Sequence, residues 1–469
     1  MNPKTHLTLF DKLWQSHHVK TLASGEDLIA IDRVFLHERT GSVALKSMLD
    51  TGYHPHRPEH VFCTMDHIVS IDADRRANDA RMDGGEAFIT ATREAAHKTG
   101  INLIDVLSPE QGIVHVISPE LGIAQPGMTL VCPDSHTCSQ GALGALAWGI
   151  GSTDAEHAMV TGTLRVNKPK QMRITVDGEL GVGVTAKDLA LYIIANYGTA
   201  GGQGAAIEYA GSTIRSLSIE ARLTLCNLAV EFAAFTAIIA PDETTFNYLK
   251  DRKYAPKDWE SAVKNWQSLT SDASAQFDVE RYINAADIPP MVTWGTSPED
   301  AVSIFEAVPQ SLKHDAYNYM DLSAGTPLES LDIGGAFIGS CTNARITDLR
   351  AAAKILKGRK VKTGLRAICV PGSMAIRRQA EEEGLDIIFK AAGFEWGSSG
   401  CALCFYAGGE SFPPGTRVIS STNRNFKGRQ GPQVKTHLAS PAIVAASAIA
   451  GHICSPKTLQ ETCKGKDHV

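Results

Sequence analysis

Three cysteines stand where they could hold a metal. Cys401 and Cys404 form a Cys-x-x-Cys pair, and Cys341 lies 60 residues before them on a glycine-flanked turn. Alone, the pair fits a redox dithiol, half of a zinc site or two core cysteines. Three thiolates would leave one corner of an iron–sulfur cluster without a protein ligand, and an open position makes a metal site catalytic. The other cysteines, in mostly apolar or tail contexts, are predicted to be structural: Cys63, Cys132, Cys138, Cys226, Cys369, Cys454 and Cys463.

Three histidines stand beside acidic residues or near the end of an expected strand. His67 follows Asp66, His136 follows Asp134 by two positions, and His115 lies in an apolar segment. A carboxylate beside an imidazole fixes its tautomer and raises its basicity, which suits proton transfer near neutral pH. A single histidine is more often an ordinary core or surface group, and that interpretation is kept for His17, His18, His54, His56 and His60.

Asn227 and Glu231 are four residues apart in an apolar segment that predicts a helix over residues 223–240, so they would share one face. Burying Glu231 without a partner would cost several kcal/mol. Its partner is expected to be one of the three histidines, or the residue forms a structural salt bridge. The glycine-rich run 198–204 lacks the phosphate-binding patterns and predicts a flexible or closely packed loop.

The elements that must position these residues are strands followed by turns and helices, the pattern of an α/β fold with parallel sheets. Strands are expected at residues 334–338, 367–370 and 417–420, each followed by a turn of small polar residues. Ligands bind outside the carboxyl ends of parallel strands. The residues expected to meet there are Cys341, Ser373, Asn423, Arg424 and Arg429.

The first two-thirds of the chain show the same alternation. A helix is expected at 85–99, ending at Gly100, and strands at 101–106, 113–117, 128–132 and 171–176. Asp177-Gly178 predicts a hairpin, and Thr185 with Asp188 predicts a capped helix. The polar stretch 251–324 predicts a boundary near residue 300, which divides the chain into 7–300, carrying the histidines and acids, and 301–466, carrying the cysteines and arginines.

Composition narrows the function classes. The 469 residues include 45 Lys plus Arg against 51 Asp plus Glu, a net charge of -6, and 43% are hydrophobic. This balance argues against nucleic acid or an anionic membrane as the main partner, and allows a local cationic pocket for a small acid. The sequence shows neither a membrane span nor a signal peptide, and its scattered cysteines indicate a reducing compartment, expected to be the cytoplasm.

Several motifs together resemble the aconitase superfamily, and within it the large-subunit family of isopropylmalate dehydratases. The resemblance runs from Thr8 to about Gly451. Its motifs are Met65-Asp-His67, Asp134-Ser-His-Thr137, Ala240-Pro-Asp-Glu-Thr-Thr245, Gly339-Ser-Cys-Thr-Asn-Ala-Arg345, Cys401-x-x-Cys404 and Asn423-Arg-Asn-Phe-x-Gly-Arg-Gln-Gly431.

The resemblance implies an aconitase-like core of three α/β/α subdomains with parallel sheets, lacking the swivel domain. It implies one [4Fe–4S] cluster on Cys341, Cys401 and Cys404. The implied reaction of leucine biosynthesis interconverts 2- and 3-isopropylmalate by loss and readdition of water at the open iron.

The resemblance also implies roles for single residues. His67 with Asp66 would protonate the departing hydroxyl. His115, paired with Glu231, and His136, paired with Asp134, would orient water. Asn227 and Asn423 would donate hydrogen bonds beside the cluster, and Arg424 and Arg429 would bind carboxylates.

The implied partner is a small subunit carrying the swivel domain, which supplies a serine base and another arginine, in a heterodimer or larger assembly. Nothing after Gly431 resembles that domain. The sequence departs from the family pattern at Leu121, Pro133, Phe232 and Gly408, and Phe405 follows the Cys-x-x-Cys pair where leucine is usual. These departures fit either drift in an isopropylmalate enzyme or another malate-type substrate: citramalate, homoaconitate, dimethylmalate or a specialised-metabolite precursor. A protein that binds RNA without catalysis is a further alternative, as is a zinc or disulfide role for Cys401 and Cys404.

Overall fold

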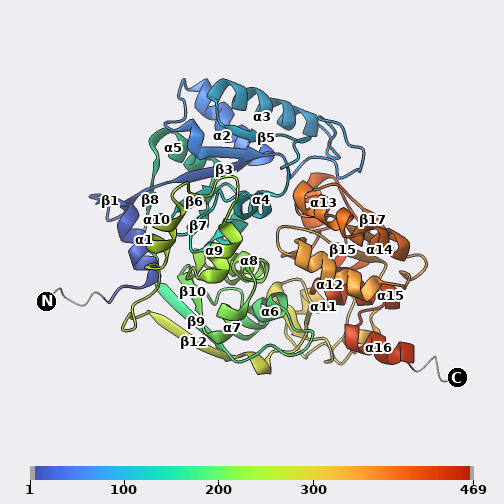
Figure 1. Cartoon of the computed structure of the whole chain (residues 1–469). Coiled ribbons are helices and arrows are strands. Elements are labelled where there is room, and N and C mark those ends of the chain that lie inside the picture. The colour runs from blue at the N-terminus through green and yellow to red at the C-terminus, as the bar shows by residue number, and fades with distance from the viewer. Residues whose placement is uncertain (1–5, 465–469) are drawn as a thin grey trace.

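The chain is organised around three parallel β-sheets with helices packed about them (Figure 1), in a computed structural model that describes residues 6–464. The first sheet has the order β5-β4-β3-β6-β7, and every neighbouring pair is parallel. Its strands are β3 (Arg33–His37), β4 (Val61–Thr64), β5 (Asn102–Ile104), β6 (Thr129–Cys132) and β7 (Leu146–Gly149).

The second and third sheets are also parallel throughout. The second, in the order β11-β10-β9-β12, contains β9 (Gln171–Asp177), β10 (Ala206–Ala210), β11 (Thr236–Ile239) and β12 (Val279–Asn284). The third, in the order β17-β16-β15-β18-β19, contains β15 (Gly335–Ile338), β16 (Arg366–Cys369), β17 (Phe394–Trp396), β18 (Arg417–Ser420) and β19 (Lys435–Leu438).

Two smaller antiparallel sheets contain the remaining strands. β1 (His18–Thr21), β2 (Asp27–Ala30) and β8 (Thr163–Val166) form one, and β13 (Met291–Thr293) pairs with β14 (Ala301–Ser303). The helices are α1 (Leu9–His17), α2 (Glu38–Asp50), α3 (Gly85–Thr99), α4 (Val114–Glu120), α5 (Ser152–Thr161), α6 (Ala186–Tyr197), α7 (Ser212–Ser216), α8 (Ile219–Asn227), α9 (Glu243–Leu249), α10 (Trp259–Trp266), α11 (His314–Met320), α12 (Ile346–Leu356), α13 (Met374–Glu382), α14 (Leu385–Ala392), α15 (Pro441–Ala450) and α16 (Pro456–Lys464).

Local signals predicted the third sheet well. Its strands β15, β16 and β18 lie where the strand-turn-helix pattern put them, and the fold class, α/β with parallel sheets, is confirmed. The capping box of α6 is present, with the Asp188 carboxylate accepting from the Thr185 N–H at 2.8 Å. α3 ends as predicted at Gly100, whose φ of 72° suits glycine.

The expected strand at residues 113–117 is wrong, because α4 begins there. A short buried apolar run fits a strand or a helix equally, and tertiary contacts decide between them. The Ile113 N–H donates to the Gly372 carbonyl, and the Val114 N–H donates to the Asp66 carboxylate at 2.8 Å. A carboxylate at a helix N-terminus stabilises the helix.

Two further expectations fail for tertiary reasons. The Asp177-Gly178 hairpin is absent, because β9 lies between two parallel neighbours, β10 and β12, and the Asp177 carboxylate instead accepts from the Ser212 N–H at 2.7 Å. The helix expected at 223–240 ends at Asn227, continues as a 3₁₀ turn (Leu228–Phe232), and gives way to β11. Ala233, with φ of 60°, makes the reversal.

The predicted boundary near residue 300 falls between the second and third sheets, beside β13 and β14, and stays a prediction. Its C-terminal limit, residue 466, lies outside the described residues. None of the helices in the described part of the chain is long and apolar enough to cross a membrane.

Candidate active site

The three cysteines singled out from the sequence line one cavity of about 170 Å³. Cys341 follows β15, after Ser340 at a φ of 79°. Cys401 directly precedes a 3₁₀ turn (Ala402–Cys404) after β17, and Cys404 is the last residue of that turn. All three are buried. The cavity is also lined by Arg39, His67, Ile113, Val114, His115, Asp134, Ser135, His136, Phe405, Arg424 and Arg429.

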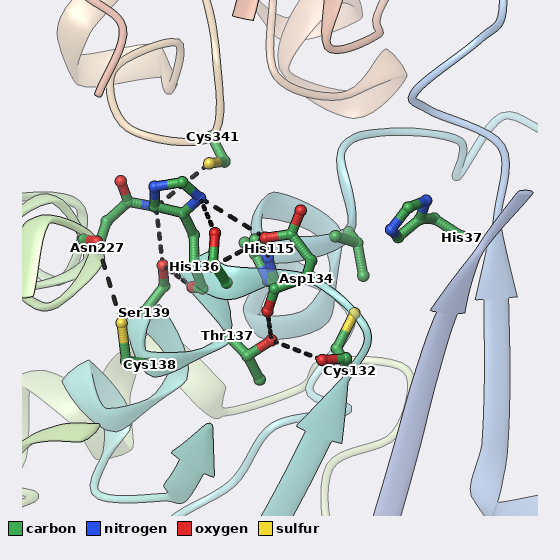
Figure 2. Close-up of polar contacts among 12 residues, drawn as sticks. His37, His115, Cys132, Asp134, His136, Thr137, Cys138, Ser139, Asn227 and Cys341 are labelled. Atoms are coloured by element: carbon green, nitrogen blue, oxygen red, sulfur yellow. Dashed lines mark hydrogen bonds and ion pairs between the residues drawn. The ribbon is translucent and has the colours of Figure 1, made fainter. Parts of the chain in front are cut away.

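Polar groups are aimed at the sulfur atoms. The Asn227 amide donates to the Cys341 Sγ at 3.2 Å, between α8 and the loop after β15 (Figure 2), and the Asn423 amide does so at 3.5 Å. The Ser340 hydroxyl lies 3.4 Å and Arg429 Nη2 3.7 Å from the Cys404 Sγ.

The surroundings of the three cysteines suit thiolate ligands of a metal. Burial raises the pKa of the Cys341 thiol to about 12 and that of Cys401 well above its usual range. A bound metal deprotonates a thiol, and amide donors stabilise the resulting sulfur charge. The donor set therefore fits a thiolate-bound metal group. The nine cysteines whose side chains are described are all unbridged, so Cys401 and Cys404 form no disulfide in this structure.

The loop that carries Cys401 is docked on the first sheet. The Cys401 N–H donates to the Asp66 carbonyl at 2.7 Å, and the Ser398 N–H donates to the Ile71 carbonyl at 2.7 Å. Arg75 Nη1 donates to the Ser399 carbonyl at 2.6 Å. The cysteine loop and the histidine loop after β4 are therefore one packed unit.

Asp134 connects the three predicted histidines. Its carboxylate oxygens lie 2.7 Å from His115 Nε2 and 3.3 Å from His67 Nε2, and one accepts from the His136 N–H at 2.8 Å (Figure 2 shows His115, His136 and Asp134). Burial opposes ionisation of Asp134, but the three histidines outweigh it and hold the pKa of this carboxyl well below its usual range.

His67 is held from both sides. Its Nδ1 lies 2.6 Å from the Asp66 carboxylate, opposite the Asp134 contact at Nε2. Burial disfavours the imidazolium, but the charge of Asp66 and the hydrogen bonds to Asp134 and Asp66 outweigh burial and raise the pKa of His67 well above its ordinary value. His67 lines the cavity, and this geometry suits its imidazolium to proton donation there.

The expected pairing of His115 with Glu231 is wrong. His115 pairs with Asp134, and the Glu231 carboxylate lies 2.9 Å from His136 Nε2. Asp134 contacts His136 mainly through the His136 backbone, so the pairing expected between these two residues is only partly present. The assignment failed because Glu231 lies in the turn after α8 rather than on a helix through residue 240.

The arginines of the loop after β18 differ in their partners. Arg424 Nε donates to the Glu231 carboxylate at 2.6 Å, whereas the Arg429 guanidinium lies 5.7 Å from the Phe405 ring centre. Ser373 is not brought to this cavity: it caps α13 by accepting from the Ile376 N–H at 3.0 Å.

A model of the aconitase family (aconitate hydratase) matches residues 11–451 of this chain. The chain belongs to the aconitase family. It is 47% identical over 465 residues to 3-isopropylmalate dehydratase large subunit 1 of Bradyrhizobium diazoefficiens, covering 97% of each chain. Among solved structures, aconitase X of Thermococcus kodakaraensis in its holo-form aligns with a TM-score of 0.46 and 13% identity, over 85% of this chain and 84% of that one.

Sequence reasoning missed three residues around His67 in this aconitase-family site. The Glu38 carboxylate, fully buried, accepts from the backbone N–H groups of Asp66 at 2.9 Å and His67 at 2.7 Å, and from that of Ile68. His37 stacks on His67 with ring centres 3.8 Å apart. Arg39 lines the cavity. The available signal was a charged Glu-Arg pair directly after a buried strand. Ligand atoms of His37, Glu38, Asp66 and His67 lie within 4.8 Å of one another; hydrogen bonds join Glu38, Asp66 and His67, whereas His37 Nδ1 is buried without a partner among the described residues.

The residues that depart from the family pattern lie in different parts of the fold, some beside the cavity and some in the core. A Cβ at Gly408 would stand 3.0 Å from the His67 carbonyl, so the glycine allows the cysteine turn to approach the histidine loop closely. The Pro133 carbonyl accepts from the Thr40 hydroxyl at 3.1 Å. Phe232 packs in the core against Tyr197, with ring centres 6.4 Å apart, and Leu121 packs on the same core.

Proposed function

We propose that this chain is the cluster-binding large subunit of a 3-isopropylmalate dehydratase, which isomerises 2- and 3-isopropylmalate by dehydration and rehydration. The observation that carries the proposal is one cavity lined by three cysteine sulfurs, three histidines and the arginines after β18. It occurs in a chain 47% identical to such a subunit over almost its whole length. The name of that relative supports leucine biosynthesis as the pathway.

Cys341, Cys401 and Cys404 would hold a [4Fe–4S] cluster, because their donor set suits thiolate ligation and provides three cysteines rather than four. When bound, the cluster supplies an open iron as a Lewis acid for the substrate's hydroxyl. The amides of Asn227 and Asn423 stabilise the charge on Cys341.

His67 acts as the acid in this proposal. It carries a proton because Asp66 and Asp134 stabilise the imidazolium, and it gives that proton to the departing hydroxyl, which leaves as water. His115 and His136, fixed by Asp134 and Glu231, orient the water for readdition. Arg424 and Arg429 bind carboxylate groups of the acid through their guanidinium forks.

A small subunit with a swivel domain would complete the site. The word "large" in the relative's name supports a two-subunit assembly. The small subunit is assigned the base that removes the carbon-bound proton and one further arginine. The cytoplasm is the proposed location.

Anaerobic co-expression with the small subunit from the same genome tests the proposal. The complex is expected to contain about four irons and four sulfides per large subunit, and to convert isopropylmalate into its unsaturated diacid, followed by ultraviolet absorbance. Turnover is measured in parallel with citramalate, homoaconitate and dimethylmalate. Zinc without sulfide would overturn the cofactor assignment. An intact cluster with turnover of another acid, or RNA binding without turnover, would overturn the substrate assignment.

A further inference from the structure

Arg39 contributes a cationic side chain to the cavity from the first sheet. It lies directly after β3, at the start of α2, and its guanidinium carbon stands 4.7 Å from the centre of the Phe405 ring. The side chain is half-buried and lines the cavity together with His67 and the three cysteines. It therefore reaches the cysteine loop from the opposite half of the chain.

The charge of Arg39 has no acidic partner among residues 6–464, since none of their carboxylates lies within 4 Å of its guanidinium. The adjacent Glu38 is unavailable, because both of its oxygens accept backbone N–H groups of the histidine loop. Arg424, in the same cavity, is by contrast paired with Glu231 at 2.6 Å. Arg39 thus has a free fork of N–H donors beside the proposed reaction site.

The Phe405 ring lies against this guanidinium. The ring also contacts the Arg429 guanidinium, at 5.7 Å, and the His67 ring, at 5.4 Å between centres. Stacking on an aromatic ring restrains an arginine while leaving the N–H groups at its edge free to bind a carboxylate bidentately. The structure therefore presents two arginines, from different sheets, beside one phenylalanine.

We propose that Arg39 is a further substrate-binding residue, which holds one carboxylate of the diacid substrate and so makes the enzyme require two acid groups. The inference rests on the proposed function for the identity of the acid. The guanidinium of Arg39 donates two parallel hydrogen bonds to the carboxylate, and its partial burial strengthens this pairing relative to water.

The test compares Arg39→Gln and Arg39→Lys with the wild type in the cluster-loaded two-subunit complex. Arg281→Gln is the matched control, because Arg281 also lies over an aromatic ring, Tyr197 at 4.9 Å, but is exposed on β12 and absent from the cavity lining. Arg39→Gln is expected to raise KM for isopropylmalate about 10- to 100-fold, with kcat changed only a few-fold. The KM of Arg39→Lys is expected to lie between those of the wild type and Arg39→Gln, because an ammonium keeps the positive charge but cannot donate two parallel hydrogen bonds.

A binding measurement separates this inference from the proposed function. Calorimetry compares an unreactive substituted succinate with its two monoamides. The wild type and Arg281→Gln should bind the diacid at least about tenfold more tightly than the monoamide that lacks the Arg39-bound carboxylate, and Arg39→Gln should lose that preference. An unchanged preference, or an effect confined to small-subunit affinity or iron content, overturns the inference. Wild type that binds diacids through Arg39 but does not turn over isopropylmalate overturns the proposed function alone.

Discussion

Acid should weaken the fold through His437, a residue of β19 with no exposed surface. Its Nδ1–H donates to the Thr293 carbonyl at 2.6 Å, and its Nε2 accepts from Arg417 Nη1 at 2.9 Å. The Arg417 contact requires the neutral ring, because a protonated Nε2 has no lone pair to accept with, whereas the Nδ1–H bond is available to either form. Burial, assisted by the charge of Arg417, lowers the pKa of His437 from 6.5 to about 3.

The direction of the change in stability with pH follows from proton binding at His437. Between pH 6.5 and 3 the unfolded chain binds a proton at His437 that the folded chain does not, so the free energy of unfolding falls as the pH falls. One pKa unit corresponds to about 1.4 kcal/mol, so the contribution lost at pH 5 is about 2 kcal/mol. The Thr293 hydroxyl accepts from the Asn425 amide at 3.2 Å, so Thr293 connects His437 to the loop that carries Arg424.

His437→Asn removes this titration while leaving a donor for Thr293. Thermal unfolding of both proteins is compared at pH 8 and pH 5, so that other titrating groups cancel in the difference. The wild type should be the more stable at pH 8, and the gap should narrow at pH 5 by about 2 kcal/mol, or about 2 °C for 469 residues that unfold as one unit. His157→Asn, at an exposed position of α5, serves as the control. A gap that stays constant or widens at pH 5 would refute the reasoning.

Three other predictions concern the site and its support. Glu231→Gln removes the charge that holds His136 and Arg424, and should lower kcat about 10²- to 10⁴-fold at unchanged iron content; a wild-type kcat would contradict the role. Asp242→Ala leaves the fully buried Arg222 without the carboxylate that it contacts at 2.6 and 2.8 Å, and should lower the free energy of unfolding by about 3 to 5 kcal/mol. Asp50→Ala, in the exposed pair with Lys46, should lower it by less than about 1 kcal/mol. Equal losses of stability would contradict the prediction. Air should abolish activity, and ferrous iron with thiol should restore it; stable activity in air would argue against an open iron ligated by Cys341, Cys401 and Cys404.

Local patterns carried the prediction of the third sheet and of the meeting of its loops. Glycine-flanked turns after apolar strands placed Cys341, Asn423 and Arg424 at one sheet edge, because parallel strands share the direction of their carboxyl ends. That Cys401 and Cys404 lie beside them rested on the family resemblance. The fold class follows from the same alternation.

Contacts between separate sheets were beyond such patterns. Glu231 pairs with His136 rather than His115 because it lies in the turn after α8. The sequence could not predict this, because the apolar segment that contains the turn has the pattern of one continuous helix. α4 forms because the Asp66 carboxylate caps it from another loop. Glu38 and Arg39 could not be singled out because they lie at the start of α2, and their contacts, the loop after β4 and Phe405, are far from them in sequence.

The docking of the Cys401 turn on the Asp66 loop joins parts of the chain 335 residues apart. At roughly 5 to 20 residues per second, a ribosome needs about 20 to 70 s to deliver the second after the first. During that interval the early loop lacks its neighbour, and no nascent fragment presents all three thiols. In the proposed enzyme, insertion of a metal group on all three thiols would therefore follow synthesis of the chain as far as Cys404, and iron content would report on the docking of these two distant loops.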